Sequence, residues 1–541
     1  MAYQNYNAEE RRDLRDLLRV SAAAFADRTA FTEKRDGVTV SYTYREYGAD
    51  VDALAAALCA RGWAGRRVVI AGNNCYAWVV AFLAVTSVGC AVSVAHSVSA
   101  DALAQVVRET DAAAVICSPD FLPKADGLDP SVARLGFDAL PDLIAAAPAD
   151  RGTDPEIDPN APAAVFFTSG ASRGVVLSHR NLCFDVAGLC RMVQFTPDDV
   201  FLSVLPIHHA YETTCGFLVP LFCGASVAFS EGLRSLTREM KEYRPTVINC
   251  VPYIAEVMYR KVEDSIRRQQ MERTVKNMIR VTNAIRPEKA ALAAKRRAFS
   301  FVHKSFGGKL RLILCSGAAS DPAVLRGFRD FGILALQAYT LVECSPVAAV
   351  NRDRFFNDAS AGLSMPDTPV DIYDMQDDGM GEIRCKGDHV MLGYFNDPAT
   401  TAKVLRDGWF YTGDLGYLDS DGFLHVIGRR KNTLETPDGK QIFPEEIERL
   451  LTSTKYVREA LIRPAAANPD DDFRLEAVLY PDAAAIAALG DENNRQRVAV
   501  EMRRAIAEVN EVLPPFKQIA SYRIANAPLP KTPTGALERD Y

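Results

Sequence analysis

Short apolar runs of four to seven residues alternate with longer helical stretches along most of this chain. The runs include RRVVIAG, CAVSVA and AAAVICS, followed further on by APAAVFFTSG, VFLSVLP, TVINCVP and LRLILCSGA. Strands that are buried on both faces have this continuous apolar character, and the helices between them are the crossovers that parallel strands require. The sequence therefore predicts a parallel α/β sheet that helices cover on both faces.

The pattern changes near Gly428. A polar loop follows, then a helix at PEEIERLL, strands at REALIRPA and LEAVLYP, and a charged helix at NNRQRVAVEMRRAIAEVN. We therefore expect an α/β protein of two domains, because 541 residues exceed one ordinary domain. Residues 1–428 would form a large domain of parallel and mixed sheets with covering helices, and residues 429–541 a smaller, mobile α+β domain. The basic-rich stretch Tyr259–Lys309 is interpreted as a solvated helical hairpin.

Charge and composition exclude several classes of protein. The net charge of −7 argues against nucleic acid as a partner, because such proteins carry a basic face. The first residues lack the apolar segment of a signal peptide, and no apolar run reaches the ~18 residues of a membrane span. The run Ala77–Ala95 is expected to be a buried helix and strand. The 12 cysteines form no C-x-x-C pair and are expected to be reduced. We expect a cytoplasmic protein, for which peripheral membrane contact stays open.

Four segments carry chemistry. The first, FFTSGASRGVVLSHRN, reads as a strand, a Gly/Ser/Thr turn and a helix, an arrangement that can cradle phosphate with backbone N–H groups. It does not match the G-x-x-x-x-G-K-[ST] loop of ATPases. The other three are LPIHHAYE, then QAYTLVECSP preceded by CSGAAS, and finally YTGDLGYLDSDGFLHVIGRRKNTLETPDGKQIFPEEIE.

In this order the segments resemble the adenylate-forming superfamily of AMP-binding enzymes. That family carries T-S-G-T-T-G-x-P-K-G, L-P-x-x-H, Y-G-x-T-E, and T-G-D followed by G-R-x-K and P-x-E-I-E. The helical stretch before FVHKSFGGKLRLILCSGAAS and the H-x-Y-E form of the second motif resemble long-chain fatty acyl-CoA synthetases. The resemblance implies an acid–thiol ligase that uses ATP, Mg²⁺ and CoA. Its substrate would be a carboxylic acid, a medium- to long-chain fatty acid, activated through an acyl-adenylate.

The resemblance also assigns roles to single residues. His209 would lie at the acyl pocket, Glu343 would hold Mg²⁺, and Lys431 would lie in the hinge about which the C-terminal domain turns. His208 would point elsewhere, so that no two-histidine metal site is expected. The residues that would bind the nucleotide or CoA are Thr168, Ser169, Gly170, Arg173, Gly317, Ala318, Tyr339, Asp414, Arg429 and Gly439.

Four parts of the molecule would share the binding of the nucleotide and CoA. The loop from Thr168 to Arg173 would face the phosphates, and Tyr339 would stack on adenine beside the backbone of Gly317 and Ala318. Asp414 would accept hydrogen bonds from both ribose hydroxyls, with Arg429 as a further donor. Gly439 lies on the loop that would approach the thiol of CoA.

The chain departs from the family pattern where phosphate should be bound. The loop reads T-S-G-A-S-R-G-V and lacks a T-T-G, three residues that can extend up to about 10 Å. In the third motif Val342 replaces a threonine and Thr340 replaces a glycine. Ala536 replaces the final lysine of P-K-T-x-x-G-K, and Lys531 is five residues out of register. Loss of one such donor typically costs about 10²–10³ in rate.

The sequence therefore predicts that adenylation is impaired while the second half-reaction persists. Two alternatives stay open. One is a non-catalytic protein that binds acyl groups or nucleotides on the ligase scaffold. The other is a stand-alone adenylating enzyme that loads a separate carrier protein.

Overall fold

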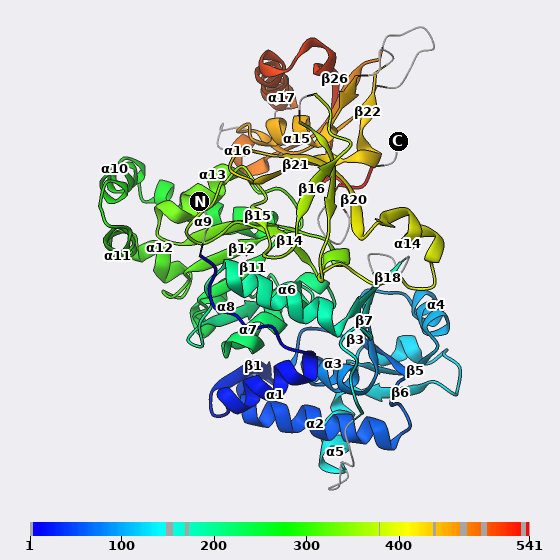
Figure 1. Ribbon diagram of the computed structural model, residues 1–541. Helices are drawn as coiled ribbons and strands as arrows, with labels where there is room; N and C mark the ends of the chain where they lie inside the picture. The colour runs from blue at the N-terminus through cyan, green and yellow to red at the C-terminus, as the bar shows by residue number, and fades with distance from the viewer. Residues whose placement is uncertain are drawn as a thin grey trace. The chain divides into compact units, whose positions relative to one another are not determined.

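The computed structural model describes residues 4–147, 155–167, 173–377, 379–436, 440–465, 473–487, 495–531 and 537–539. The chain divides into two compact units (Figure 1). The first comprises Met1–Val370 and Cys385–Phe410, and the second Asp371–Arg384 and Tyr411–Tyr541. The second unit thus takes in strands that precede Gly428. The boundary expected between residues 428 and 429 stays a prediction.

The first large sheet of the first unit has nine strands in the order β15-β14-β13-β12-β11-β9-β10-β1-β2. The pairs from β13 through β12, β11, β9 and β10 to β1 are parallel, and β2, β14 and β15 add antiparallel edges. The bounds are β1 Thr29–Arg35, β2 Val38–Thr43, β9 Val200–Ser203, β10 Ser226–Phe229, β11 Val247–Cys250, β12 Leu312–Cys315, β13 Leu334–Thr340, β14 Val347–Val350 and β15 Leu363–Ser364.

The second large sheet has seven strands in the order β18-β8-β7-β4-β3-β5-β6. Its strands from β7 to β6 are parallel, and β8 and β18 are antiparallel. The two sheets confirm the predicted α/β fold with parallel and mixed pairing. The bounds are β3 Arg67–Ala71, β4 Cys90–Val94, β5 Ala112–Cys117, β6 Ala133–Gly136, β7 Pro162–Phe167, β8 Gly174–Ser178 and β18 Gly393–Tyr394.

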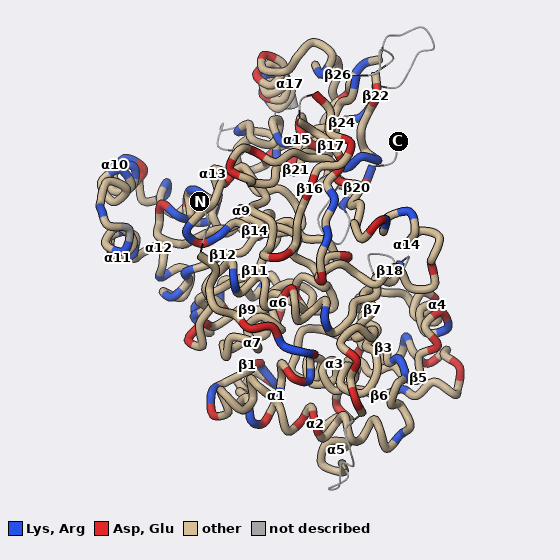
Figure 2. Tube along the Cα trace, viewed as in Figure 1, with Lys and Arg blue, Asp and Glu red and all other residues tan. Residues whose placement is uncertain are grey.

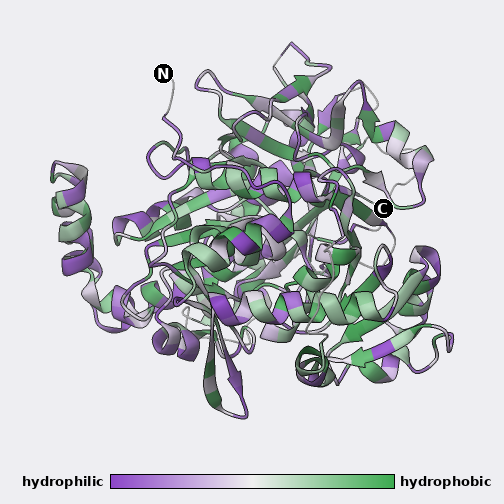
Figure 3. Ribbon diagram, turned by 60° about the horizontal axis from the view of Figure 1, so that its bottom comes forward, coloured by the Kyte–Doolittle hydropathy of each residue, from purple (hydrophilic) through white to green (hydrophobic). Residues whose placement is uncertain are grey.

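Helices follow the strands of both sheets, and Figure 3 shows the hydrophobic residues concentrated in the strands and in the helices packed on them. The apolar run Ala77–Ala95 is confirmed as a buried helix, α3, and a buried strand, β4. Helix α3 is apolar on all sides, as expected for a helix that is surrounded by protein. The helices of this unit are α1 Leu14–Ala24, α2 Tyr44–Ala60, α3 Tyr76–Val88, α4 Ala100–Thr110, α5 Leu140–Ala145, α6 His179–Met192, α7 Val219–Cys223, α8 Leu236–Tyr243, α9 Pro252–Arg268, α10 Glu272–Asn283, α11 Glu288–Ala298, α12 Ser300–Ser305, α13 Pro322–Asp330 and α14 Pro398–Val404.

The basic-rich stretch is confirmed as helical. It contains the end of α9, the pair α10 and α11, and α12. Helices α10 and α11 form a hairpin that stands away from the sheets of the first unit (Figure 1), and Lys and Arg residues recur along it (Figure 2).

The second unit has α+β character. Strands β16 Val370–Tyr373, β17 Gly381–Cys385, β20 Trp409–Leu418 and β21 Leu424–Arg429 pair in this order. A separate sheet of β24 Val457–Pro464, β25 Leu475–Pro481 and β26 Ile519–Ile524 packs with α15 Pro444–Thr452 and α17 Arg495–Val512 around an apolar core. The predicted helices and strands after Gly428 are therefore confirmed. The remaining elements of this unit are α16 Ala483–Ala487 and the short strands β22 Leu434–Glu435 and β23 Gln441–Ile442. The short strand β19 Leu405–Arg406 belongs to the first unit.

None of the helices that the structure describes combines the length and the apolar character that a membrane span requires.

Candidate functional site

The carboxyl ends of β12 and β13 bring together the residues predicted to bind adenine. These strands are parallel neighbours, so Gly317 and Ala318 directly after β12 lie at the same edge as Tyr339 near the end of β13. The hydroxyl of Ser316 donates to the carbonyl of Ala338 at 3.0 Å and ties the two ends together. Gly317 has φ +91°, a conformation that favours glycine. Its backbone and that of Ala318 are exposed, whereas Tyr339 is buried. This edge can therefore offer an open backbone beside an aromatic ring.

Glu343 lies in a short 3₁₀ turn, Val342–Cys344, that follows β13. Its carboxylate Oε1 accepts a hydrogen bond of 2.9 Å from the hydroxyl of Tyr394. Tyr394 belongs to β18 and pairs with Val175 of β8, the strand that follows the glycine-rich loop. One antiparallel strand pair thus links the predicted phosphate loop to the predicted metal ligand. The sequence interpretation missed Tyr394, whose only signal was the short G-Y-F-N-D-P turn before α14.

Arg173 is the described end of the predicted phosphate loop. Its guanidinium carbon lies 5.6 Å from the centroid of the Tyr394 ring, within the range of a cation–π contact. Arg173 and Glu343 therefore contact the ring and the hydroxyl of the same tyrosine. Outside the described residues lie the other predicted members of the loop, Thr168, Ser169 and Gly170, with Ala171 and Ser172.

Thr340 and Val342 are the residues of the third motif that depart from the family pattern. The hydroxyl oxygens of Thr340 and Ser316 are 2.6 Å apart, so the threonine that stands in place of glycine bonds to the end of β12. The pairing of β13 with β14 is irregular between Tyr339 and Thr340. The half-buried side chain of Val342 has no polar atom to offer a phosphate.

His208 and His209 lie in the loop after β9, with ring centroids 4.9 Å apart. Burial lowers the pKa of both imidazoles, that of His208 to about 3. Both rings are therefore neutral near pH 7. The hydroxyl of Tyr211 donates to the carbonyl of Leu314 at 2.9 Å and holds this loop against β12. Within the described part of the chain, no three His, Cys, Asp or Glu residues are grouped as a metal site.

Glu212 is a buried carboxyl group that the sequence interpretation did not single out for chemistry. It begins a π-helical turn, Glu212–Leu218, a feature that is frequent at functional sites. Ser203 donates to Glu212 Oε1 at 2.6 Å, and Asn74 donates to the Ser203 hydroxyl at 2.8 Å. Burial raises the pKa of Glu212 to about 8. Because Asn74 Oδ1 also accepts from the Ile207 N–H at 2.9 Å, this network fixes the loop that carries the two histidines.

In the second unit, Asp414 and Arg429 are register partners on β20 and β21. Arg429 Nε lies 2.7 Å from Asp414 Oδ1, and Asp414 is buried while Arg429 is half-exposed. The predicted ribose ligands are therefore adjacent. Lys431 lies in the short 3₁₀ turn Arg430–Asn432, directly after β21. Gly439 lies outside the described residues, as does Ala536.

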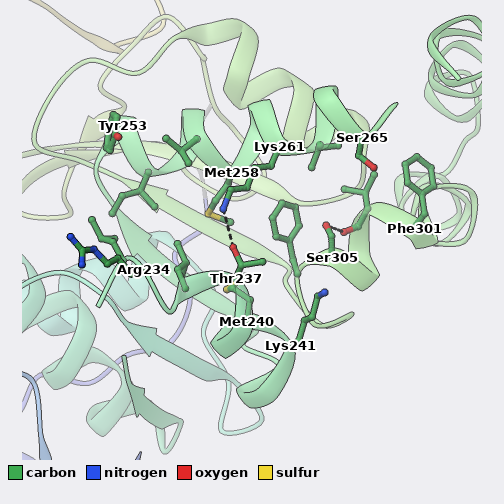
Figure 4. Close-up of a pocket in the computed structure, with 17 residues that line it drawn as sticks. Arg234, Thr237, Met240, Lys241, Tyr253, Met258, Lys261, Ser265, Phe301 and Ser305 are labelled. Atoms are coloured by element: carbon green, nitrogen blue, oxygen red, sulfur yellow. Dashed lines mark hydrogen bonds between the residues drawn. The ribbon is translucent and has the colours of Figure 1, made fainter. Parts of the chain in front are cut away.

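An apolar cavity of about 350 Å³ lies between α8, α9 and α12 of the first unit (Figure 4). Lys261 of α9 donates to the hydroxyl of Thr237 on α8 at 2.9 Å, across the cavity. Val251, the residue before α9, lies beside Gly317. A Cβ atom added to Gly317 would be 3.5 Å from a methyl group of Val251. Val251 and Gly317 are not among the residues that line the cavity, and neither is any residue that the sequence predicted for the site. The apolar lining of the cavity includes Leu236, Met240, Val257, Met258, Val262 and Phe301.

Comparison with known proteins decides the family. Residues 18–395 match the profile described as AMP-binding enzyme. The chain belongs to the AMP-binding enzyme family. The resemblance predicted from the four motifs is thereby confirmed.

Several curated AMP-binding relatives are ligases of long-chain fatty acids. Long-chain-fatty-acid–CoA ligase 5 of Rattus norvegicus is 28% identical over 318 residues, which cover 55% of this chain and 46% of the relative. The chain thus spans about half the length of the relatives that head the comparison. The chloroplastic long-chain-fatty-acid–[acyl-carrier-protein] ligase AEE15 of Arabidopsis thaliana is 25% identical, over 97% of this chain and 84% of the relative.

Solved AMP-binding structures share the fold over nearly the whole chain. A fatty acyl-CoA synthetase of Mycobacterium tuberculosis aligns with a TM-score of 0.68 and 21% identity, over 97% of both chains. ATP-bound MatB of Rhodopseudomonas palustris aligns with a TM-score of 0.75 and 23% identity, over 97% of both chains. The predicted architecture of a large α/β part and a smaller C-terminal part is therefore confirmed.

Proposed function

We propose that this AMP-binding protein is an acid–thiol ligase for medium- to long-chain fatty acids whose first half-reaction is slow. In that step the acid's carboxylate attacks the α-phosphate of ATP, giving an acyl-adenylate and pyrophosphate. In the second step the thiol of CoA attacks the acyl carbon, forms the thioester and releases AMP. The observation that carries the proposal is the shared edge of β12 and β13, where the exposed Gly317 and Ala318 lie beside the ring of Tyr339 and can take a nucleotide base. The class of acid is inferred from the long-chain fatty-acid ligases among the relatives.

The residues of the first unit fit a magnesium nucleotide. Mg²⁺ is commonly held by one or two carboxylates together with substrate phosphates and water, and Glu343 offers such a carboxylate with Oε1 fixed by Tyr394. The bound ion would offset negative charge on the phosphates. Tyr339 and the backbone of Gly317 would face the base. Arg173 would bring a positive charge to the same end of the site.

His209 is suited to orient the carboxylate of the acid. Its pKa is lowered by burial, so the ring is neutral and can donate one hydrogen bond without adding a charge to the pocket. The Asn74–Ser203–Glu212 network would keep its loop in place. A neutral donor leaves the nucleophilic carboxylate free of a strong ion pair.

Slow adenylation is expected because donors to the phosphates are missing. Charge that develops on phosphate oxygens must be met by preorganised donors, and each loss costs about 10²–10³ in rate. Val342 has no hydroxyl group to give, and Ala536 and the shortened loop remove further donors. Asp414 and Arg429 remain as the expected ribose ligands.

The proposal is tested by two assays on the same preparation. Fatty-acid-dependent exchange of pyrophosphate into ATP reports the first step, and CoA-dependent consumption of a pre-made acyl-adenylate reports the second. We expect slow exchange and faster consumption. Insertion of Thr-Thr-Gly after Gly170 together with Ala536→Lys should then raise exchange by several orders of magnitude, at about 10²–10³ for each restored donor.

Two results would contradict the proposal. If the restored variant gains no exchange, the diagnosis of the phosphate site is wrong. If neither assay shows turnover while AMP still binds, the chain is a nucleotide-binding protein without ligase activity.

The second step has two candidate thiol acceptors, CoA and a carrier protein. The relative AEE15 is named as an acyl-carrier-protein ligase, and it aligns with nearly the whole of this chain. Supplying the acyl-adenylate with either CoA or a phosphopantetheinylated carrier protein distinguishes the two, since only the correct acceptor should be acylated at a substantial rate.

A further inference from the structure

The segment Tyr259–Lys309 has a charge opposite to that of the rest of the chain. It contains 14 Lys and Arg residues against 4 Asp and Glu residues, a net charge of +10 in a chain whose total is −7. Seven of the 14 lie on α10 and α11, where Figure 2 shows Lys and Arg residues. The proposed ligase chemistry makes no use of them, so this concentration of positive charge needs its own explanation.

The cations of α10 share one face of the helix. Arg273, Lys276 and Arg280 are three and four residues apart, a spacing that aligns side chains on a helix, and all three are exposed. Within the described part of the chain, no carboxylate lies at ion-pair distance from any of them. The opposite face holds Val275 and Met278, which pack on the core of the first unit. The basic face is therefore free to meet a partner.

Apolar side chains are exposed on the same part of the molecule. Val281 of α10 is 64% exposed and Leu292 of α11 is 47% exposed. Leu233 and Tyr253, which line the cavity, are exposed by 53% and 52%. These four are the majority of the seven large apolar side chains that the described residues of the first unit expose.

The cavity adjoins the hairpin through α9. This helix lines the cavity along its length and leads directly into α10. In Figure 4, Ser265 and Phe301 lie at the end of the cavity nearer the hairpin helices. Three further cations line it: Arg234, Lys241 and Lys261. Positive charge and exposed apolar groups thus occur together from the cavity to the hairpin.

We propose that the α10–α11 hairpin docks on a lipid bilayer that contains anionic phospholipids. Basic clusters on amphipathic helices bind anionic lipid surfaces, and apolar side chains beside them enter the interface. Arg273, Lys276 and Arg280 meet lipid phosphates while Val281 and Leu292 enter the interface. A nucleic acid would use the cations and leave the apolar groups exposed, whereas a bilayer uses both. The proposal does not depend on the ligase activity.

The test measures partition of the full chain onto vesicles by flotation. Vesicles of phosphatidylcholine alone are compared with vesicles that also contain phosphatidylglycerol, at low and at high salt. We expect binding to the anionic vesicles only, weakened by salt. Arg273→Gln/Lys276→Gln/Arg280→Gln should lower the partition coefficient about a hundredfold, since each cation near the surface contributes about fivefold.

A matched control removes three exposed cations of the second unit. Arg497→Gln/Arg503→Gln/Arg504→Gln on α17 makes the same change in charge, and it should leave the partition unchanged. Circular dichroism of both triple variants checks that the helices persist. Val281→Ser/Leu292→Ser should lower the partition by about tenfold or more while keeping every charge.

Several outcomes would overturn the proposal. Absence of binding to anionic vesicles at low salt would do so, as would equal losses in the two triple variants. An unchanged partition of the Val281→Ser/Leu292→Ser variant would show that these side chains do not enter the bilayer interface, which contradicts the proposed mode of docking. A purified acidic carrier protein could also bind the wild type but not the Arg273→Gln/Lys276→Gln/Arg280→Gln variant. If that variant still binds vesicles as the wild type does, the surface is a protein-binding site.

Discussion

The hydroxyl of Tyr394 donates a hydrogen bond of 2.9 Å to Oε1 of Glu343. Tyr394 lies on the strand paired with β8, so the bond joins the segment after the glycine-rich loop to the expected Mg²⁺ ligand. We predict that Tyr394→Phe weakens binding of Mg·ATP by about 10- to 100-fold, the range for a lost hydrogen bond to a charged group. Calorimetry with ATP, in the presence of Mg²⁺ and then of a chelator, measures the effect.

The matched control is Tyr243→Phe, because the buried Tyr243 hydroxyl has no hydrogen-bond partner among the described residues. This variant should bind Mg·ATP as the wild type does. If Tyr394→Phe also binds normally, or loses affinity equally with and without Mg²⁺, then Tyr394 does not act through Glu343.

The sequence predicted the parts of the site that depend on local motifs. Gly317 and Tyr339 come together because the ends of adjacent parallel strands share one edge, which the alternating pattern already implies. Tyr394 could not be predicted in this way, since its contact with Glu343 spans 51 residues and depends on the pairing of β18 with β8. Glu212, the last residue of the H-x-Y-E motif, was given no chemical role from the sequence. Its shifted pKa follows from burial, which no short motif encodes.

The division of the chain shows the same limit. The sequence pattern changes at Gly428, and the elements after it were predicted correctly. The second compact unit nevertheless includes Asp371–Arg384, because β17 pairs with β20. Such pairing between distant strands is decided by three-dimensional packing. By contrast, the helical character of Tyr259–Lys309 was predicted from its polar, basic composition, since an amphipathic helix is a local property.

Asp414 provides a second prediction, on recognition of the ribose. Its carboxylate lies 2.7 Å from Arg429 Nε and is buried, so it is held in one orientation. We expect wild-type protein to bind AMP about 10- to 100-fold more tightly than 2′,3′-dideoxy-AMP, because each ribose hydroxyl donates to a charged acceptor. Asp414→Asn should bind both nucleotides with similar, weak affinity.

Fluorescence titration of the two nucleotides measures this ratio directly. The comparison is independent of catalysis, and it separates ribose recognition from a general loss of stability. Equal binding of both nucleotides by the wild type would show that Asp414 does not contact the ribose.

The cavity between α8, α9 and α12 predicts selectivity for chain length. Val257 is half-buried on α9 and lines the cavity. Val257→Trp should fill part of it and weaken binding of a palmitoyl-sulfamoyl-adenosine analogue about tenfold or more, relative to the octanoyl analogue. Stable analogues are used so that slow adenylation does not mask the result. Val257→Ala should bind the palmitoyl analogue as the wild type does. If Val257→Trp loses affinity for both analogues equally, the acyl chain does not bind in this cavity.

Glu212 predicts how stability depends on pH. Burial raises the pKa of its carboxyl group from an ordinary 4.5 to about 8. Between these values the folded protein holds a proton that the unfolded chain releases, so the free energy of unfolding falls as pH rises. The fall amounts to at most about 1.4 kcal/mol per pH unit. Glu212→Gln keeps an acceptor for Ser203 and cannot ionise, so it should lack this contribution.

Melting temperatures across that window measure the difference between wild type and Glu212→Gln. The melting temperature of the variant should increase relative to that of the wild type as the pH rises from about 4.5 to 8. At higher pH the difference between the two should stay constant. Glu109→Gln, at an exposed carboxylate of α4, should follow the wild type throughout. If the melting curves of the wild type and Glu212→Gln against pH stay parallel across the whole window, the carboxyl group of Glu212 is ionised in the folded protein. The network with Asn74 and Ser203 would then hold the histidine loop through a charged group.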